Sequence, residues 1–389
     1  MRYVRRTQRV FWGRGSLSRL GRELDRLEAA RVMVITGRTL GENRDVRTLV
    51  HSATRTTANS TRITEFFPGA TPQSPVTAVE ATVDAIEEFS PDALIALGGG
   101  SALVTTRAAS ILHGEKQASG TANLEDLCTR RSPEGTFVSP RLRAPKTPVI
   151  ALPTSPTTAV STAGCALTTD EGGARLAIYD PAARAQAIVL EPRLLITAPT
   201  SVTVSSSLNA IAMAVEGILS RSATFFTDSQ LGHALGTLLD ILPDVPSSGG
   251  TPEQVLHLAL AATSVGDAAE TSGAGLSAAI SHTLAHRIRA SNGVIDSLIL
   301  PHVLDYLDPV SDDRKDVLAR SLNCPTGDIR QRLDSFFCRL GLPRRLRDLH
   351  LPESALGDAA RDAMTDFAVT SSPRTITQAD ALDVLRAAW

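Results

Sequence analysis

The feature that most constrains this 389-residue chain is an apolar run that ends in three glycines. Residues 93–97 read Ala-Leu-Ile-Ala-Leu, which is typical of a buried parallel strand, and the small and apolar residues 102–111 predict a helix. Between them stand Gly98, Gly99, Gly100 and Ser101. Glycines let a phosphate approach the backbone, and the N–H groups at a helix start favour negative charge. The stretch predicts a pyrophosphate-binding turn, and a plain tight turn remains the alternative.

Strands and helices alternate through the first half of the chain and give way to helices in the second. Predicted strands cover residues 9–15, 31–37, 65–69, 93–98, 147–152 and 185–190, and predicted helices cover 17–27 and 76–89. From residue 200 onward, helical periodicities cover 202–219, 227–242, 252–268 and 275–290, with three or more helices after them. We therefore expect an α/β dinucleotide-binding (Rossmann-like) domain over residues 1–199 and an all-helical domain over residues 200–389.

Composition excludes several classes of protein. The formal net charge of −2 makes no electrostatic case for nucleic acid or an anionic membrane as partner. Four cysteines form no CxxC pair, which favours reduced thiols in the cytoplasm over a disulfide framework. The basic N-terminus is not followed by an apolar run, so we expect no signal peptide, and we expect no membrane span.

Short motifs lie in a consistent order along nearly the whole chain. They are the segments 10–15, 68–72, 97–101, 152–155, 206–216, 281–286, 300–304, 340–343 and 372–374. Their order and spacing together resemble the iron-containing alcohol dehydrogenase-like family, which includes the maleylacetate reductases and is related in fold to dehydroquinate synthase. The resemblance implies an N-terminal dinucleotide domain, a C-terminal all-helical domain, a cleft between them for cofactor and substrate, and a homodimer.

The resemblance also implies a nicotinamide cofactor, NAD or NADP. It assigns the binding site to Gly37, Arg38, Gly98, Gly99, Gly100, Ser101, Thr154 and Ser155. Many family members have Thr-Asp where the strand over residues 31–37 of this chain ends in Thr36 and Gly37, followed by Arg38. A carboxylate there would bind the ribose and repel a 2′-phosphate, whereas an arginine could pair with that phosphate. NADP is therefore permitted beside NAD, and the alternative is that Arg38 simply points into water.

The family's metal positions are altered in this chain. Its alcohol dehydrogenases hold a divalent metal through an Asp, a His four residues later, a His on a second helix and a His in the following loop. The matching residues here are Asn209, Met213, His282 and Asn292. An amide, a thioether and one imidazole supply no anionic ligand, so we predict no catalytic metal. Maleylacetate reductases resemble this chain in having the Asn but keep a His where Met213 stands, and Met213 is also open to interpretation as core packing.

Without a metal, an alcohol or carbonyl reaction still needs a proton donor or acceptor. His282 and His286 are the candidates because they are four residues apart on one predicted helix, and a structural pair of histidines is the alternative. Asn209 would hydrogen-bond the reacting oxygen in place of the metal. We expect Arg107, Met213 and Asn292 to line the substrate cleft, with Arg107 standing near the place of a family lysine.

Three functions remain open. The first is a metal-independent NAD(P)-dependent oxidoreductase that acts on a hydroxyl or carbonyl group, for example in tailoring a natural product or a ribosomal peptide. The second is a maleylacetate reductase-like enzyme for a dicarboxylic keto or enol acid, whose charges Arg107, Arg287 and Arg289 could balance. The third is a non-catalytic subunit that keeps the fold and the nucleotide. We expect a cytoplasmic protein whose partners are a nicotinamide dinucleotide and a small-molecule or peptide substrate.

Overall fold

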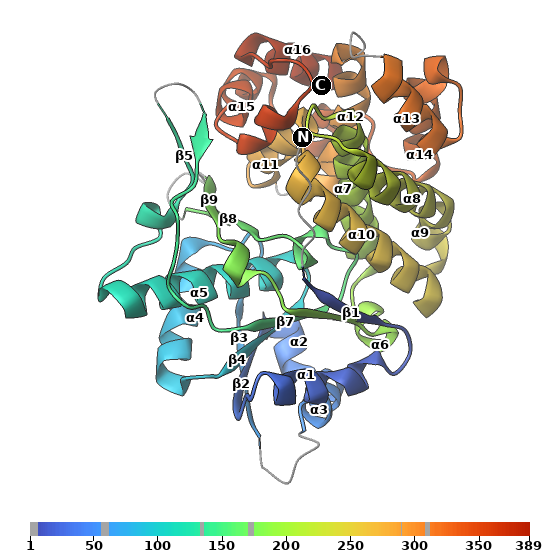
Figure 1. The fold of residues 1–389 in the computed structure, drawn as a ribbon. Coiled ribbons are helices and arrows are strands. Elements are labelled where there is room, and N and C mark those ends of the chain that lie inside the picture. Colours follow the sequence, from blue (N-terminus) through green and yellow to red (C-terminus); the bar gives the residue numbers. More distant parts are fainter. Residues whose placement is uncertain (1–6, 56–61, 133–135, 170–174, 289, 308–311) are drawn as a thin grey trace. The chain divides into compact units, whose positions relative to one another are not determined.

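The computed structural model describes residues 7–55, 62–132, 136–169, 175–288, 290–307 and 312–389. Contacts between residues divide the chain into two compact units, and the division falls between Ala198 and Pro199. We call the first the α/β unit and the second the helical unit, and each is described by itself (Figure 1).

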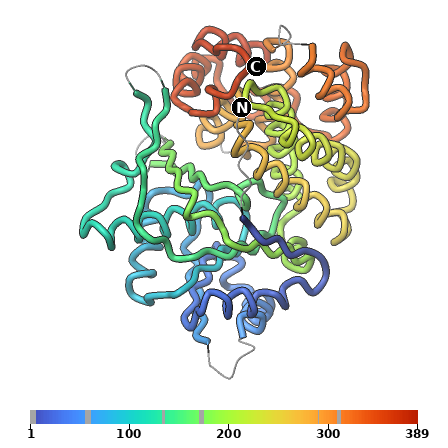
Figure 2. Tube along the Cα trace, viewed as in Figure 1, coloured from blue at the N-terminus to red at the C-terminus, as the bar shows by residue number. Residues whose placement is uncertain are grey.

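The α/β unit is built on a six-stranded parallel sheet with the order β1-β10-β7-β4-β2-β3. Its strands are β1 (Arg9–Trp12), β2 (Arg31–Gly37), β3 (Ile63–Ala70), β4 (Ala93–Gly98), β7 (Val149–Pro153) and β10 (Ala187–Leu190). All six residues of β4 are buried, as expected of a strand covered on both faces. The blue N-terminal strand lies beside the green strand β10, with Arg9 opposite Ala187 (Figure 2).

Helices of the α/β unit connect these strands, and two small hairpins are added. The helices are α1 (Leu20–Arg26), α2 (Arg38–Glu42), α3 (Arg44–Ala53), α4 (Val76–Phe89), α5 (Gly100–Ser119) and α6 (Pro192–Leu195). The hairpins pair β5 (Arg130–Arg131) with β6 (Phe137–Val138) and β8 (Gly164–Thr168) with β9 (Arg175–Tyr179). The chain passes from β2 to β3 on one side and then to β4 on the other side of β2. This reversal between β2 and β4 is where α/β sheets usually bind ligands.

The helical unit contains no strand among its described residues. Its helices are α7 (Thr200–Leu219), α8 (Phe225–Ile241), α9 (Val245–Ser248), α10 (Pro252–Ser272), α11 (Leu276–Ala285), α12 (Asn292–Tyr306), α13 (Asp312–Leu322), α14 (Ile329–Arg339), α15 (Leu356–Ala363) and α16 (Gln378–Ala388). Helix α7 packs against α8, α10 and α12 and supplies much of the core. By length and composition its 20 residues could span a membrane, but 72% of the apolar window is buried inside the unit. Such burial is typical of a core helix.

The predicted fold class, a parallel-sheet α/β domain followed by an all-helical domain, is confirmed. Two details differ. Helix α3 and the β8–β9 hairpin were not predicted, and the helix expected over residues 275–290 ends at Ala285. The N–H groups of Arg287 and Ile288 both donate to the carbonyl of Leu284, which closes a turn there. Periodicity does not register such an end because neither glycine nor proline marks it.

Candidate functional site

The carboxyl edge of the α/β sheet gathers the eight residues predicted to bind the cofactor. Gly37 and Arg38 follow β2, Gly98 to Ser101 follow β4, and Thr154 and Ser155 follow β7. These three strands are neighbours, with Thr36 opposite Leu97 and Gly98 opposite Pro153. The residues therefore lie along one edge, at the reversal of strand order where dinucleotides bind in related topologies.

The glycine turn after β4 exposes backbone rather than side chains. Gly98 has φ +146°, which side-chain-bearing residues rarely adopt, and an added Cβ would lie 2.9 Å from the Cβ of Ala102. A Cβ on Gly99 would lie 3.3 Å from Oγ of Ser155. Gly99 caps the 20-residue helix α5 without any side-chain acceptor on its first-turn N–H groups. Free N–H groups at a helix start, flanked by a buried hydroxyl, suit a diphosphate.

A second loop is tied to the same helix start. The backbone N–H of Gln73 donates to Oγ of Ser101 at 3.2 Å, and Oγ of Ser74 donates to the carbonyl of Ser101 at 3.2 Å. The N–H of Thr154 donates to the carbonyl of Gly98 at 3.0 Å. These bonds keep the turn in place without using the N–H groups at the start of α5.

Gly37 ends β2 and Arg38 begins α2, where the sequence predicts a contact with a 2′-phosphate. Gly37 has an ordinary φ of −79°, and an added Cβ would make a normal contact of 3.4 Å with the carbonyl of Ala70. The backbone itself therefore does not require glycine there. Arg38 begins α2 with an exposed side chain that has no ion-pair partner among the described residues. It is available to an external anion.

Arg107 is used inside the α/β unit. It is 2% exposed and donates to the carbonyls of Gly164 at 2.8 Å and Ala159 at 2.6 Å. These bonds hold the chain that leads into β8. The contacts favour a structural role for Arg107 over the expected place in a substrate cleft.

The helical unit brings together α7, α11 and α12 around Asn209. Nδ2 of Asn209 donates to Oδ2 of Asp296 at 2.9 Å. A Cβ on Gly293 would overlap the carbonyl oxygen of Ser205 and lie 2.8 Å from the backbone N of Asn209. Gly293 therefore allows α12 to approach α7 closely, and its neighbour Asn292 lies at the first turn of α12. Met213 is one turn beyond Asn209 and packs partly buried against the core.

Two fully buried carboxyl groups support this arrangement. Burial raises the pKa of Asp296 to about 8, against the opposing effect of its hydrogen bonds with Asn209 and Ser281. Burial likewise raises the pKa of Glu216 to about 7, although Glu216 accepts the N–H of Ser277 at 2.8 Å at the start of α11. Neither has a cationic partner among the described residues, so burial shifts both toward the neutral form.

The two predicted histidines differ in their surroundings. His282 lies within α11, and its Nδ1 is 2.7 Å from Oδ2 of Asp366, whereas His286 directly follows the helix end. Sequence patterns missed Asp366, Asp296 and Gly293. Asp296 is the single charged residue in the apolar stretch 293–301, which is a signal that could have found it. Asp366 offered none, because it is distant in sequence and lies in a polar segment.

The donors at the family's metal positions do not suit a divalent metal. Asn209 offers a neutral amide oxygen while its Nδ2 donates to Asp296, Met213 offers a thioether, and His282 offers one imidazole. Over the described ranges, no cluster of three or more His, Cys, Asp or Glu side chains is arranged to hold a metal ion. Iron and zinc favour several imidazole or carboxylate ligands, and this set provides one imidazole.

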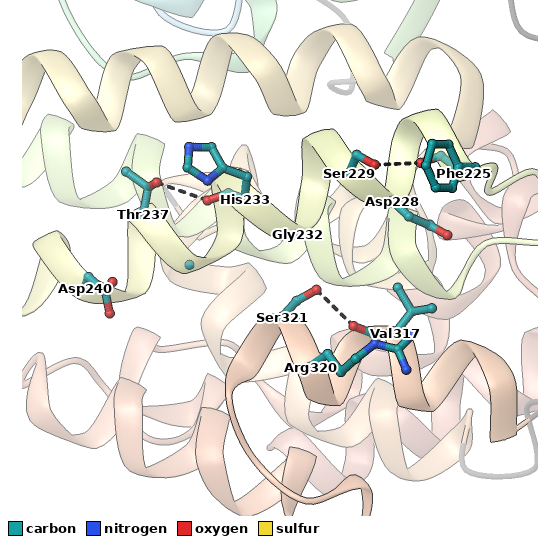
Figure 3. Close-up of a pocket in the computed structure, with 11 residues that line it drawn as sticks. Phe225, Asp228, Ser229, Gly232, His233, Thr237, Asp240, Val317, Arg320 and Ser321 are labelled. Atoms are coloured by element: carbon teal, nitrogen blue, oxygen red, sulfur yellow. Dashed lines mark hydrogen bonds between the residues drawn. The ribbon is translucent and has the colours of Figure 1, made fainter.

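A separate groove of about 640 Å³ lies between α8 and α13 in the helical unit. Asp228, His233 and Asp240 lie on α8, and Arg320 and Ser321 lie on α13, while the ring of His233 points away from α13 (Figure 3). None of the predicted site residues lines it. Asp228 is already paired with Arg314 at 2.6 Å, and the hydroxyls of Ser321 and Thr237 bond to backbone carbonyls of their own helices. The groove is distinct from the residues around Asn209.

Comparison with known proteins covers both units. The family description "Iron-containing alcohol dehydrogenase" matches residues 7–192, and "Fe-containing alcohol dehydrogenase family, C-terminal" matches residues 203–389. The chain is 24% identical to the NAD-dependent methanol dehydrogenase of Bacillus methanolicus, with 96% of each chain covered. It is 27% identical to maleylacetate reductase 1 of Cupriavidus pinatubonensis, covering 77% of this chain and 72% of that protein.

A solved structure agrees with these matches. The iron-containing alcohol dehydrogenase of Thermococcus thioreducens is 25% identical, with a TM-score of 0.83 and 98% of each chain covered. The two family descriptions together span nearly all of the sequence, in the order of the two units. This chain belongs to the iron-containing alcohol dehydrogenase family.

Proposed function

We propose that this protein is a metal-independent NAD(P)-dependent oxidoreductase that acts on a hydroxyl or carbonyl group. The observation that carries the proposal is the combination of a glycine-lined turn at the carboxyl edge of β4 with a metal-ligand set that has lost its carboxylate. Family membership and the NAD-dependent relative support the nucleotide. For the substrate we keep the hypothesis drawn from the sequence, which is a natural product or a ribosomal peptide.

The α/β unit supplies the nucleotide contacts. The N–H groups at the start of α5 would receive the diphosphate, because Gly98 to Gly100 present no Cβ to it. Ser155 and Thr154 place buried hydroxyls beside the turn. Arg38, exposed at the start of α2, would pair with a 2′-phosphate and so permit NADP. The bound nicotinamide supplies or accepts a hydride.

The helical unit supplies the proton chemistry. During reduction of a carbonyl, His282 or His286 would donate a proton to the oxygen while the carbon receives the hydride, and the reverse occurs during oxidation. Asn209 keeps one amide hydrogen on Asp296 and has a second for the reacting oxygen. A single such donor contributes about 3 kcal/mol of transition-state stabilisation in well-studied cases.

The first experiment is titration of the purified protein with NADH and NADPH. We expect quenching or shift of nucleotide fluorescence and a higher melting temperature, because a ligand that binds only the folded state stabilises it. Metal analysis of the same protein, purified without chelator, should find no stoichiometric iron or zinc. Stoichiometric metal would overturn metal independence, and indifference to all four nicotinamide nucleotides would overturn the enzymatic proposal.

A maleylacetate reductase-like activity is the second candidate. The 27% identity to a maleylacetate reductase favours it, as does Asn209 in a sequence context that resembles that branch. The arginines that would bind a dicarboxylate substrate are less available for that role. Arg107 is buried, Arg287 is paired with Asp362, and Arg289 lies outside the described residues. Turnover of maleylacetate with NADH decides between this candidate and the first.

The proposal also includes a cytoplasmic homodimer. A non-catalytic nucleotide-binding subunit is the outcome that remains if nucleotide binds but no alcohol, aldehyde or keto acid is turned over. Light scattering of the full chain measures the oligomeric state, and a monomer at micromolar concentration would remove the dimer from the proposal.

A further inference from the structure

A local excess of positive charge lies where the chain runs through α14 and the turn after it. Residues 329–350 contain six arginines and two aspartates, although the whole chain carries a formal net charge of −2. Asp334 is paired with Arg330 at 2.9 Å. Asp348 accepts the backbone N–H groups of Arg344 and Arg345 at 3.2 and 2.9 Å. Both carboxylates of the segment are therefore engaged.

Four arginines of this segment are exposed and make no ion pair with any carboxylate of the described residues. We call them the arginine face, and they are Arg339, Arg344, Arg345 and Arg347. Other arginines of the helical unit do find carboxylates, as Arg314 does with Asp228 and Arg361 does with Asp358. The arginine face therefore presents four positive charges that the described part of the chain does not pair.

Two of these side chains are held at the end of α14. Arg344 donates to Sγ of Cys338, which is the residue before Arg339. The guanidinium of Arg339 lies 5.9 Å from the centre of the Phe336 ring. A thiol and an aromatic ring restrain the two side chains without cancelling their charge.

The other two arginines are held by the end of the chain. Nη1 of Arg345 donates to the carbonyl of Ala387 at 3.3 Å, and the guanidinium of Arg347 lies 5.8 Å from the centre of the Trp389 ring. The arginine face thus joins the end of α14 to the end of α16. Because these contacts already restrict the side chains, a partner that binds them pays less of their conformational entropy.

We propose that the arginine face binds an acidic segment of a polypeptide partner. Guanidinium groups are planar and bind carboxylates through paired hydrogen bonds, and Asp and Glu side chains supply those carboxylates. A long nucleic acid is a poorer match, because beyond this small face the chain offers no excess of positive charge to follow a polyanion. None of the residues assigned to cofactor or substrate belongs to the arginine face, so this binding is independent of the proposed function.

The binding measurement uses two fluorescently labelled peptides of equal length. The acidic probe alternates glutamate and serine, and the neutral probe has glutamine in place of each glutamate. We expect fluorescence anisotropy of the full-length protein to show at least tenfold tighter binding of the acidic probe at about 50 mM salt. The preference should shrink severalfold at about 300 mM salt, because mobile ions screen exposed charges. Equal binding of the two probes at low salt would overturn the proposal.

Two charge-matched variants place the binding on the arginine face. The first changes all four of its arginines to glutamine, which keeps a hydrogen-bonding side chain and removes the charge. The control removes the same charge from four exposed arginines elsewhere, through Arg22→Gln, Arg44→Gln, Arg320→Gln and Arg361→Gln. We expect the first variant to bind the acidic probe at least tenfold more weakly than wild type, and the control to stay within threefold. Equal affinity of the two variants would overturn the proposal.

Melting temperatures check that both variants fold. If the four-glutamine variant does not, Arg344→Gln and Arg347→Gln serve as single changes, each expected to weaken the acidic probe two- to fivefold. Unchanged affinity in both single variants would overturn the proposal in the same way.

Two other occupants are outcomes of the same experiment. A labelled single-stranded DNA with the same number of charges as the acidic probe is measured beside it, and tenfold tighter binding of the DNA would overturn the peptide in favour of nucleic acid. Light scattering at low salt compares the assembly of wild type with that of the four-glutamine variant. An oligomer that only the wild type forms would make a second copy of this chain the occupant and would also overturn the proposal.

Discussion

The α/β unit and the helical unit build their candidate sites from different materials. In the α/β unit the cofactor edge consists mainly of backbone, at Gly98 to Gly100, and of the start of α5. In the helical unit the site consists of side chains that meet across three helices, with Asn209 on α7 bonded to Asp296 on α12. A backbone site survives many substitutions nearby, whereas a side-chain site changes chemistry with each residue.

The two units also treat buried carboxylates differently. In the α/β unit, Asp180 lies 3.1 Å from Nζ of Lys146, and Glu191 pairs with Arg193 at 3.2 Å. In the helical unit, Glu216 and Asp296 have no cation near them among the described residues, and burial raises the pKa of each. The scaffold under Asn209 is therefore sensitive to pH.

The largest expected effect breaks the close packing under the helical site. Gly293→Ala would push a methyl group into the carbonyl of Ser205 and force α12 away from α7. We expect a loss of about 3 kcal/mol or more in the free energy of unfolding, since overpacking commonly costs 1–3 kcal/mol and backbone cannot move aside cheaply. Urea denaturation measures it. The control is Gly357→Ala, a helical glycine with open space around it, which should be neutral or stabilising by up to about 1 kcal/mol.

The second prediction concerns Glu216. Its pKa is raised to about 7 in the folded chain, against 4.5 as its ordinary value, so the folded state binds more protons than the unfolded state between these values. The free energy of unfolding should therefore fall as pH rises from about 4.5 to about 7. Glu216→Gln keeps an acceptor for Ser277 and removes the ionisation. Its stability relative to wild type should be higher at pH 8 than at pH 5, by on the order of 2 kcal/mol. An equal difference at both pH values would contradict the pKa shift.

The third prediction tests the backbone site by charge. Ser101→Asp places a carboxylate in the first turn of α5, where it favours the helix but repels a diphosphate. We expect at least tenfold weaker NADH binding, about 1.4 kcal/mol, without loss of melting temperature. Ser101→Asn is the neutral control of similar size and should bind within threefold of wild type. Equal affinity of the two variants for NADH would place the diphosphate elsewhere.

The smallest expected effect concerns cofactor choice. Arg38→Ala should weaken NADPH binding about fivefold, or roughly 1 kcal/mol, and leave NADH unchanged, because only NADPH carries the 2′-phosphate. Arg44→Ala, an exposed arginine on the next helix, controls for general electrostatic attraction. An unchanged ratio of NADPH to NADH affinity in Arg38→Ala would show that Arg38 points into solvent.

Sequence patterns were sufficient for the strands of the large sheet and for placing the glycine turn at a strand end. The predicted boundaries of β2 and α4 match the structure residue for residue, because an apolar run bounded by glycine and an amphipathic helix bounded by Pro75 and Ser90 are local signals. Parallel strands share a carboxyl edge, so placing Gly37, Gly98 and Thr154 at strand ends was enough to bring them to one side of a sheet.

The helical site could be predicted only in part. The family resemblance pointed to Asn209, Met213, His282 and Asn292, but no pattern indicated that Asn209 bonds to Asp296, 87 residues away, or that Asp366 holds His282 from 84 residues away. The end of α11 before His286 was also invisible to periodicity. Contacts between side chains of distant helices depend on helix rotation and spacing, which a linear pattern does not specify.

The sequence by itself determined a parallel α/β domain, a helical domain and a glycine turn at a strand end, because backbone conformation and burial follow from local residue type. Only the tertiary structure decided which polar groups form hydrogen bonds with one another. Arg107 donates to backbone carbonyls, Asn209 donates to the buried Asp296, and His282 is hydrogen-bonded to Asp366. The physical reason is that hydrogen bonds require placement to within a few tenths of an ångström, and such placement arises from the packing of whole helices.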